Sequence, residues 1–279
     1  MQYFSADCLI LRAVDRGDHD KLLTLLSAEQ GKFYAILKGA RSMHRRQVAA
    51  TEPYTWSQIE LYERGGVKWI KTATATESFP DLRYDMDKLF LAAYFCDVAG
   101  ELSDENQPAG EILPLTLNAL HMLATTTGED ARIKGAFEMR AACIGGFAPS
   151  LQVCKRCQHP VVGDSFLDVM NGALICKACH TRAEGLVPLQ TGDDLRERHV
   201  ICQLSPGSAA ALSFVATAPS KRVFAFRITD GRELDEFGRA AEQYLLHHLE
   251  RSFPSLENLK KLDGLMKQRN GACNNREVL

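Results

Sequence analysis

The sequence predicts an α+β protein in which a small barrel of strands precedes a helical bundle that carries an inserted cysteine module. Three observations support this class: five short strand-like segments in the first eighty residues, helical spacing of apolar residues after Pro80, and two late C-x-x-C pairs. The expected domains are a barrel over 1–80, a helical domain in two parts over 81–150 and 183–268, a cysteine module over 151–182, and a flexible tail over 269–279.

The composition is that of an ordinary globular protein, with 46% hydrophobic and 24% charged residues and a net charge of -2. Residues 1–80 hold 11 basic and 9 acidic residues, and the remainder holds 22 and 26. The start of the chain lacks the features of a signal peptide, and the uncharged stretch 112–128 is too short and polar to span a bilayer. We therefore expect a cytoplasmic, nucleoid-associated protein with no membrane partner, whose nine cysteines stay reduced.

The first eighty residues alternate strand-like segments with turns. The segments are rich in β-branched, aromatic and aliphatic residues, and turn sequences such as Gln30-Gly31 and Gly65-Gly66 separate them. The expected strands are 7–14, 21–27, 32–38, 54–62 and 67–76. Five short strands in this length favour the five-stranded OB-fold barrel.

Beyond Pro80 the pattern becomes helical. In 85–102, apolar residues from Leu89 to Ala99 recur at spacings of three and four, which is typical of an amphipathic helix. Gly145-Gly146 and Pro149 end a later helix. The expected helices are 85–102, 110–124, 131–144, 193–202, 208–216 and 234–252, with one further strand over 223–229.

Two C-x-x-C pairs, Cys154 with Cys157 and Cys176 with Cys179, are separated by eighteen residues. Each pair can form a tight knuckle with both thiolates pointing the same way, and two knuckles complete a tetrahedron around one Zn²⁺. Four sulfurs leave no open coordination position, so a structural zinc is expected. The alternative is four buried cysteines without metal. His159 and His180 are close enough to substitute as ligands, but we expect both to be solvated. The other five cysteines are isolated.

A basic segment runs from Lys32 to Arg46, with five basic residues and no acid. It is expected to include a cationic loop between two strands that follows a phosphate backbone and gains affinity by counterion release. The alternative is a solvated loop. Aromatic residues nearby could stack on bases, although packing in the barrel core is the simpler interpretation: Phe33, Tyr34, Tyr54, Trp56, Tyr62 and Trp69.

Motifs of several enzyme classes are missing from the sequence. There is no phosphate-binding loop, no H-E-x-x-H, no nucleophile elbow and no dinucleotide fingerprint. His248-Leu249-Glu250 has the first part of a deaminase motif, but it follows both cysteine pairs, and neither pair has a preceding proline. We expect a protein that is not an enzyme. Two alternatives stay open: a zinc-ribbon docking protein of nucleic-acid metabolism, and a zinc-dependent nucleic-acid hydrolase.

Several segments resemble the RecO family of recombination mediators. Arg16-Gly17-Asp18-His19-Asp20-Lys21-Leu22-Leu23-Thr24-Leu25-Leu26 is similar to the family's opening block, and AILKGAR at 35–41 to the next one. Residues 137–140 and 146–151 resemble the stretch that leads into the first cysteine knuckle. The resemblance covers residues 1–182. Gln158 departs from the family pattern, which has glycine there, and this puts the knuckle's turn geometry in doubt.

The resemblance implies an OB-fold followed by helices with a zinc module, and a protein that binds single- and double-stranded DNA and anneals strands. It also implies two partners, RecR and the C-terminal tail of single-stranded-DNA-binding protein (SSB), and a role in loading recombinase on SSB-coated DNA. Phosphate contact is assigned to Lys38, Arg41, Arg45 and Arg46, with Lys32, Lys68 and Lys71 as a weaker outer set. For the acidic tail, we expect a groove lined by Arg132, Lys134, Phe137 and Arg140.

Overall fold

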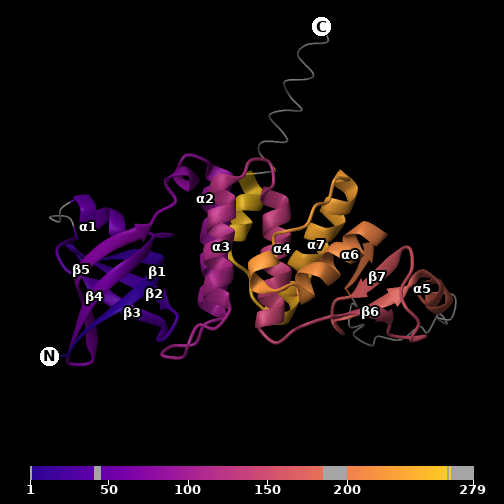
Figure 1. Ribbon diagram of the computed structural model, residues 1–279, viewed down its shortest axis with the longest axis horizontal. Helices are drawn as coiled ribbons and strands as arrows, with labels where there is room; N and C mark the ends of the chain where they lie inside the picture. Colours follow the sequence, from indigo (N-terminus) through magenta and orange to yellow (C-terminus); the bar gives the residue numbers. More distant parts are fainter. Residues whose placement is uncertain (1, 41–44, 185–199, 263, 265–279) are drawn as a thin grey trace, which may run out of the picture. The chain divides into compact units, whose positions relative to one another are not determined.

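The computed structural model describes residues 2–40, 45–184, 200–262 and 264 (Figure 1). The chain forms two compact units, and each is described by itself. The first, here called the barrel unit, comprises Met1–Thr127 with the described residues from Ser252 onward. The second, here called the module unit, comprises Gly128–Arg251. The boundary between the units therefore falls inside the helical stretch expected over 81–150.

The barrel unit begins with five strands that close into a barrel in the order β1-β2-β3-β5-β4. Neighbours are antiparallel except β3 and β5, which pair in parallel where Ile36 lies opposite Trp69. Closure leaves no free sheet edge, and the arrangement confirms the expected OB-fold. The strands are β1 (Gln2–Arg16), β2 (Asp20–Ser27), β3 (Gly31–Leu37), β4 (Trp56–Arg64) and β5 (Val67–Glu77).

Alternation along the strands fills the barrel. On β3, Phe33, Ala35 and Leu37 point inward and are at most 2% exposed, whereas Tyr34 points outward and is 44% exposed. A short helix, α1 (Arg45–Ala50), joins β3 to β4. This corrects the expectation of a plain loop between those strands, since the last two residues of the basic segment, Arg45 and Arg46, begin a helix.

Two helices of the barrel unit follow the strands: α2 (Met86–Glu101) and α3 (Ile112–Thr125), preceded by the 3₁₀ turn η2 (Pro80–Arg83). Asp85 caps α2 by accepting hydrogen bonds from two backbone N–H groups of the first turn. Residues 254–262 are helical, and Phe253 packs edge-on against Tyr94 of α2 at a centroid distance of 5.5 Å. The end of the described chain thus belongs to the barrel unit.

The module unit combines three longer helices and one short helix with a small sheet. The longer helices are α4 (Asp130–Ile144), α6 (Pro206–Thr217) and α7 (Gly231–Leu249). Gly135 of α4 allows a close approach to α7, since a Cβ there would lie 2.5 Å from the Phe237 ring. The sheet has the order β6-β8-β7-β9, with β6 (Ser150–Cys154), β7 (Ser165–Asp168), β8 (Ala173–Cys176) and β9 (Ile201–Leu204); helix α5 (Lys177–Glu184) follows β8.

Two expected elements of the module unit were wrong. Ile201 and Cys202, expected in a helix over 193–202, belong to strand β9, which pairs antiparallel with β7; residues 193–199 lie outside the described residues. The strand expected over 223–229 is irregular backbone after the 3₁₀ turn η3 (Ser220–Arg222). Phe226 in this segment packs against Phe214 and Phe237, so its apolar residues cover helices instead of pairing in a sheet.

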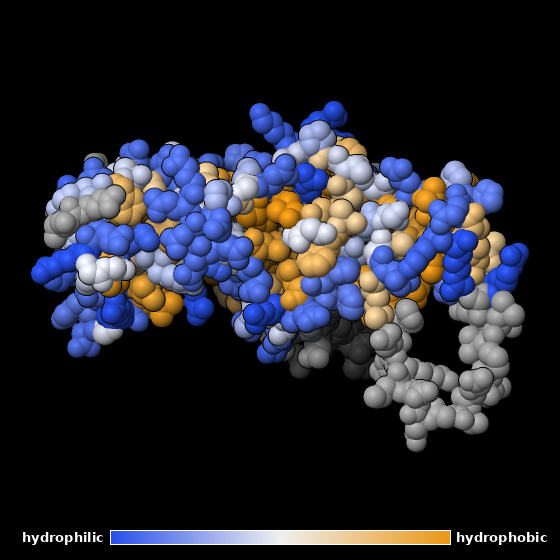
Figure 2. All heavy atoms as spheres, turned by 90° about the horizontal axis from the view of Figure 1, so that it is seen from below, coloured by the Kyte–Doolittle hydropathy of each residue, from blue (hydrophilic) through white to orange (hydrophobic). Residues whose placement is uncertain are grey.

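Among the described residues, no helix is both long enough and apolar enough to cross a membrane. In the space-filling view, hydrophilic residues cover much of the surface and apolar residues emerge between them in patches (Figure 2).

Candidate nucleic-acid interface and metal centre

The four cysteines of the two pairs meet in the module unit. Cys154 ends β6, Cys176 ends β8, and Cys179 lies in the first turn of α5. Their sulfurs all lie within 4.8 Å of one another, and the Sγ atoms of Cys157 and Cys176 are 3.9 Å apart. A tetrahedral zinc with bonds of about 2.3 Å needs sulfurs roughly 3.8 Å apart. The four thiols therefore fit one tetrahedral metal ion.

Backbone hydrogen bonds shape the first knuckle. The N–H of Cys154 donates to the His159 carbonyl at 2.9 Å, and the N–H of Gln158 donates to the Cys154 carbonyl at 2.9 Å. Gln158 has φ 61°, the left-handed conformation that favours glycine, and its amide donates to the Lys155 carbonyl at 2.9 Å. Glutamine thus adopts the turn at this position, and the departure from the family's glycine does not prevent the knuckle.

The pKa values of the cysteines diverge. Burial tends to raise the pKa of Cys154, but backbone N–H donors, that of Cys176 foremost, lower it to about 6. Hydrogen bonding to Cys176, followed by burial, raises the pKa of Cys179 to about 12. The four thiols alone therefore resist full deprotonation, because neighbouring thiolates repel one another. A divalent cation would supply the missing positive charge.

The two nearby histidines differ in exposure. His159 is exposed, as expected. His180 was expected to be solvated, but its ring stacks on Phe166 at a centroid distance of 3.8 Å and an interplanar angle of 7°. His180 of α5 is thus a packing residue against Phe166 of β7. Among the described residues, the grouped metal-ligand atoms belong to the four cysteines only.

A groove of about 340 Å³ crosses the outer face of the barrel. Its floor is Leu22 of β2 and Ile36 of β3, and Tyr34 stands beside them. Two cations, Arg16 before the β1–β2 turn and Lys68 after the β4–β5 turn, line it together with one acid, Glu105. These two turns and the face of strands 2 and 3 are where OB-folds bind oligonucleotides. Sequence reasoning missed Arg16, because neither its spacing nor its neighbours distinguish it.

Aromatic side chains divide between the two faces of the barrel. Phe33 belongs to the core, as the simpler interpretation predicted. By contrast, Tyr62 and Trp69 stack on the outside at a centroid distance of 6.4 Å, and Tyr3 continues the row at 6.0 Å from Tyr62. Four of the seven exposed large hydrophobic residues in the described chain lie on barrel strands: Tyr3, Val14, Tyr34 and Val67. The outer face therefore offers flat apolar surface for bases.

The four main cations of the basic segment are only partly described. Lys38 is exposed directly after β3, and the Asp20 carboxylate accepts a hydrogen bond from the Gly39 N–H at 2.9 Å. This contact ties the start of the basic segment to the β1–β2 turn that borders the groove. Arg41 lies outside the described residues. Arg45 and Arg46 begin α1, and their side chains lie outside the described part of the chain.

The outer set of cations is engaged within the barrel unit. The Lys32 ammonium donates to the Gly100 carbonyl at 2.5 Å, so this residue anchors the barrel to α2. The Lys68 ammonium lies 5.6 Å from the centroid of the Phe33 ring and also lines the groove. Lys71 forms an exposed ion pair with Glu60 at 3.5 Å. Only Lys68 of these three contributes to the groove.

The groove expected around α4 does not have the expected geometry. Phe137 is fully buried, and Arg132 is 7% exposed and donates to the Phe224 carbonyl at 2.6 Å. The Lys134 ammonium lies between Glu138, at 2.7 Å, and Glu242, at 2.6 Å. Arg140 donates to the Ala216 carbonyl at 3.1 Å. Arg132 and Phe137 are thus buried, whereas Lys134 and Arg140 stay partly exposed but make their contacts within the module unit.

Two family models match consecutive stretches of the chain. Residues 1–79 match the family model described as Recombination protein O N terminal, and residues 83–193 match Recombination protein O C terminal.

Full-length relatives agree with these matches. A protein of Acetivibrio thermocellus named DNA repair protein RecO is 28% identical over 263 residues, covering 94% of this chain and 98% of the relative. Proteins of the same name from Anaeromyxobacter sp. (strain K) and Anaeromyxobacter dehalogenans (strain 2CP-C) are 31% and 32% identical, each covering 92% of this chain and 96% of the relative. The fold, the cysteine cluster and these likenesses agree, and the chain belongs to the RecO family of DNA repair proteins.

Proposed function

We propose that this protein binds and anneals DNA strands as a recombination mediator, and helps load recombinase on single-stranded DNA coated with SSB. RecR and the acidic C-terminal tail of SSB are the proposed protein partners, and the proposed location is the cytoplasm, at the nucleoid. The observation that carries the proposal is the barrel groove. Two of its lining residues, Arg16 and Lys68, are cations, and an exposed ring, Tyr34, lies with them at the place where OB-folds bind oligonucleotides.

Annealing of this kind needs no covalent chemistry. Cations beside the groove, together with Lys38, Arg41, Arg45 and Arg46, would neutralise phosphates and lower the repulsion between two strands. Tyr34 would stack on unpaired bases without reading their sequence. Pairing between complementary strands then proceeds by itself once the strands are held close.

The metal has a structural role in this proposal. Cys154, Cys157, Cys176 and Cys179 would hold one Zn²⁺, and four thiolates fill its tetrahedral shell. Bound there, the ion would supply the positive charge that keeps all four sulfurs deprotonated and would join β6, β8 and α5. The SSB tail would contact the chain outside the four α4 side chains that make their contacts within the module unit.

A strand-annealing assay tests the proposal. Wild type should anneal complementary oligonucleotides, and the rate should fall as salt rises. The quadruple variant Lys38, Arg41, Arg45, Arg46→Ala should anneal much more slowly. Four lost phosphate contacts should make the slope of log affinity against log salt shallower by about 3 for single strands.

A second pair of variants tests the groove itself. Tyr34→Ala should weaken single-strand binding by about 1–3 kcal/mol, the range for one stacked base. Tyr84→Ala is the matched control, because Tyr84 is 87% exposed and does not line the groove. Wild type that fails to anneal would contradict the function. Equal annealing by wild type and all three variants would leave the function standing and refute the site.

A further inference from the structure

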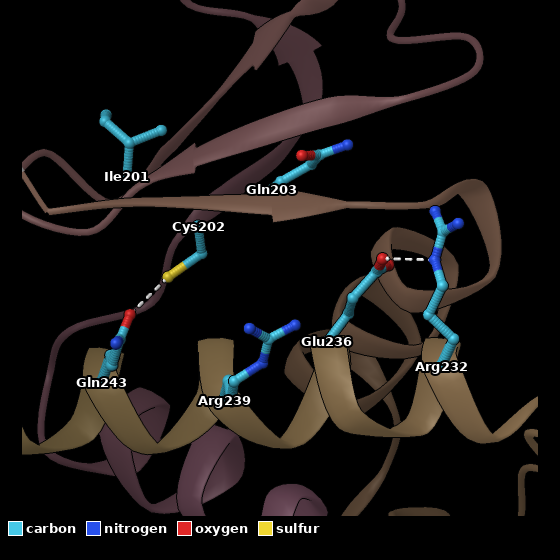
Figure 3. A pocket seen from close by; sticks show the side chains of 7 residues that line it. All are labelled: Ile201, Cys202, Gln203, Arg232, Glu236, Arg239 and Gln243. Atoms are coloured by element: carbon cyan, nitrogen blue, oxygen red, sulfur yellow. Dashed lines mark hydrogen bonds and ion pairs between the residues drawn. The ribbon is translucent and has the colours of Figure 1, made fainter.

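A second polar pocket, of about 490 Å³, lies entirely within the module unit. Strand β9 contributes Cys202 and Gln203 to its lining, and helix α7 contributes Arg232, Glu236, Arg239 and Gln243. Figure 3 shows the α7 side chains rising from one face of the helix toward the strand. Strand β9 and helix α7 therefore each form one wall of the pocket, and none of its lining residues belongs to the metal centre.

One of its charges is neutralised within the protein. Arg232 donates to the Glu236 carboxylate at 3.0 Å, and the other carboxylate oxygen accepts from the Ser205 N–H at 2.8 Å and the Ser208 hydroxyl at 3.0 Å. The Glu236 side chain is 7% exposed. These contacts hold the pKa of Glu236 near 2, against the opposing effect of burial. Glu236 thus pairs with Arg232 and neutralises its charge within the protein.

Arg239 is different. Its Nε donates to the Asp235 carbonyl of its own helix at 3.3 Å, and within the described part of the chain no carboxylate lies at ion-pair distance from its guanidinium. Gln243 lies one helical turn further, and its Oε1 accepts from the Cys202 thiol at 2.8 Å, which leaves the amide N–H₂ as the group it can offer. The pocket therefore presents one unneutralised cation beside amide donors.

This combination selects an anion with several acceptor oxygens. A guanidinium matches a phosphate or a carboxylate with two parallel hydrogen bonds. A peptide with an acidic, apolar end would also need an apolar wall, and the lining is polar apart from Ile201 and Cys202. A phosphodiester needs only the donors that are present.

We infer that this pocket binds a backbone phosphate of a DNA strand, with Arg239 as its main contact, so that the module unit holds DNA independently of the barrel groove. The inference rests on the proposed function and extends it. Annealing brings two strands together, and a chain with two separate phosphate sites can contact both of them.

The test is single-strand binding by the full, metal-loaded chain, with a fluorescent thymidine oligonucleotide as the probe. Arg239→Ala should weaken binding about 3- to 10-fold and reduce the salt slope by about 0.7, the contribution of one phosphate. Arg239→Lys should recover part of the loss, because it keeps the charge but not the fork geometry. Arg227→Ala is the matched control: Arg227 is an exposed arginine of the same unit outside the pocket, and this variant should bind like wild type.

The outcomes separate this inference from the proposed function. If Arg239→Ala keeps wild-type affinity and salt slope while the quadruple barrel variant loses binding, the inference is overturned and the proposed function stands. If wild type binds no DNA, both fall. If Arg239→Ala loses binding of a peptide that ends in two aspartates but keeps DNA binding, the pocket serves a protein partner and the inference is overturned. Thermal melting of each variant confirms that it is folded.

Discussion

The barrel and the cysteine-bearing sheet are both built from strands, but they reach stability in different ways. The barrel strands are 7 to 15 residues long, close on themselves and enclose a continuous apolar core. The sheet of the module unit has strands of 4 or 5 residues, and it does not close into a barrel in the part of the chain that the structure describes. Short strands bury little apolar area, so we expect the sheet to depend on a metal ion held by the four cysteines, whereas the barrel depends on packing.

Metal removal should separate the two regions most strongly, because it should destabilise the cysteine-bearing sheet and leave the barrel unchanged. Cys176→Ser, or treatment with a chelator, should unfold the small sheet, because structural zinc contributes on the order of 10 kcal/mol to small zinc-binding domains. Hydrogen exchange should rise across β6 to β8 and stay unchanged across β1 to β5. Loss of DNA binding by a variant that remains folded would instead place the metal in the DNA site.

The matched control for this experiment is Cys143→Ser. Cys143 lies on α4 outside the cluster, and this variant should retain one metal ion per chain. Metal release to a colorimetric chelator measures the stoichiometry directly. Unchanged exchange in the sheet after complete chelation would show that the strands are stable without the ion.

A second test compares the stability that one ion pair contributes in each unit. Lys134→Ala should destabilise the module unit by about 3–5 kcal/mol, because it leaves the fully buried Glu138 without its cation. Lys71→Ala removes a lysine whose pair with Glu60 is more than half exposed, and it should cost less than about 1 kcal/mol. Urea denaturation of both variants measures the difference, and equal losses would contradict the argument from burial.

A third test concerns glycine in the barrel unit. Gly31 has φ +61°, and a Cβ there would lie 1.7 Å from the Gln107 carbonyl oxygen and 2.8 Å from that of Asp104. Gly31→Ala should therefore cost about 3 kcal/mol or more, since the α2–α3 connection must move away from β3. Gly17→Ala, at φ +65° with open space, should cost only about 1 kcal/mol. Similar melting temperatures for the two variants would show that the connection yields easily.

The sequence predicted elements whose pattern is local. All five barrel strands and helices α2, α3, α4, α6 and α7 follow from alternation or helical spacing, and the cysteine cluster follows from two short pairs. It could not predict β9, because Ile201-Cys202-Gln203-Leu204 is a short apolar run that fits a helix as well as a strand until β7 is known to lie beside it.

The sequence also could not predict which side chains of α4 point into the module unit. Arg132, Phe137 and Arg140 have the composition of a binding surface, but the partners that bury them, Phe224 and Ala216 among others, are about 75 to 90 residues away in the chain. The barrel groove could not be predicted for the same reason, because contacts between distant parts of the chain form it. Lys68 was predicted as an outer phosphate contact, but its place beside Arg16 in one groove depends on the closure of the barrel, which a local pattern does not show.

Strand β9 has a consequence for synthesis of the protein. The four cysteines and the β7–β8 hairpin are complete at Cys179, but β9 ends at Leu204, about 25 residues later. At 5–20 residues per second, a ribosome needs roughly one to five seconds for that interval. During it, the outer edge of β7 has unpaired backbone groups that another nascent chain could pair with. Slower translation would lengthen the exposure, so the yield of soluble protein should depend on codon usage between Cys179 and Leu204 more than on codon usage in the barrel.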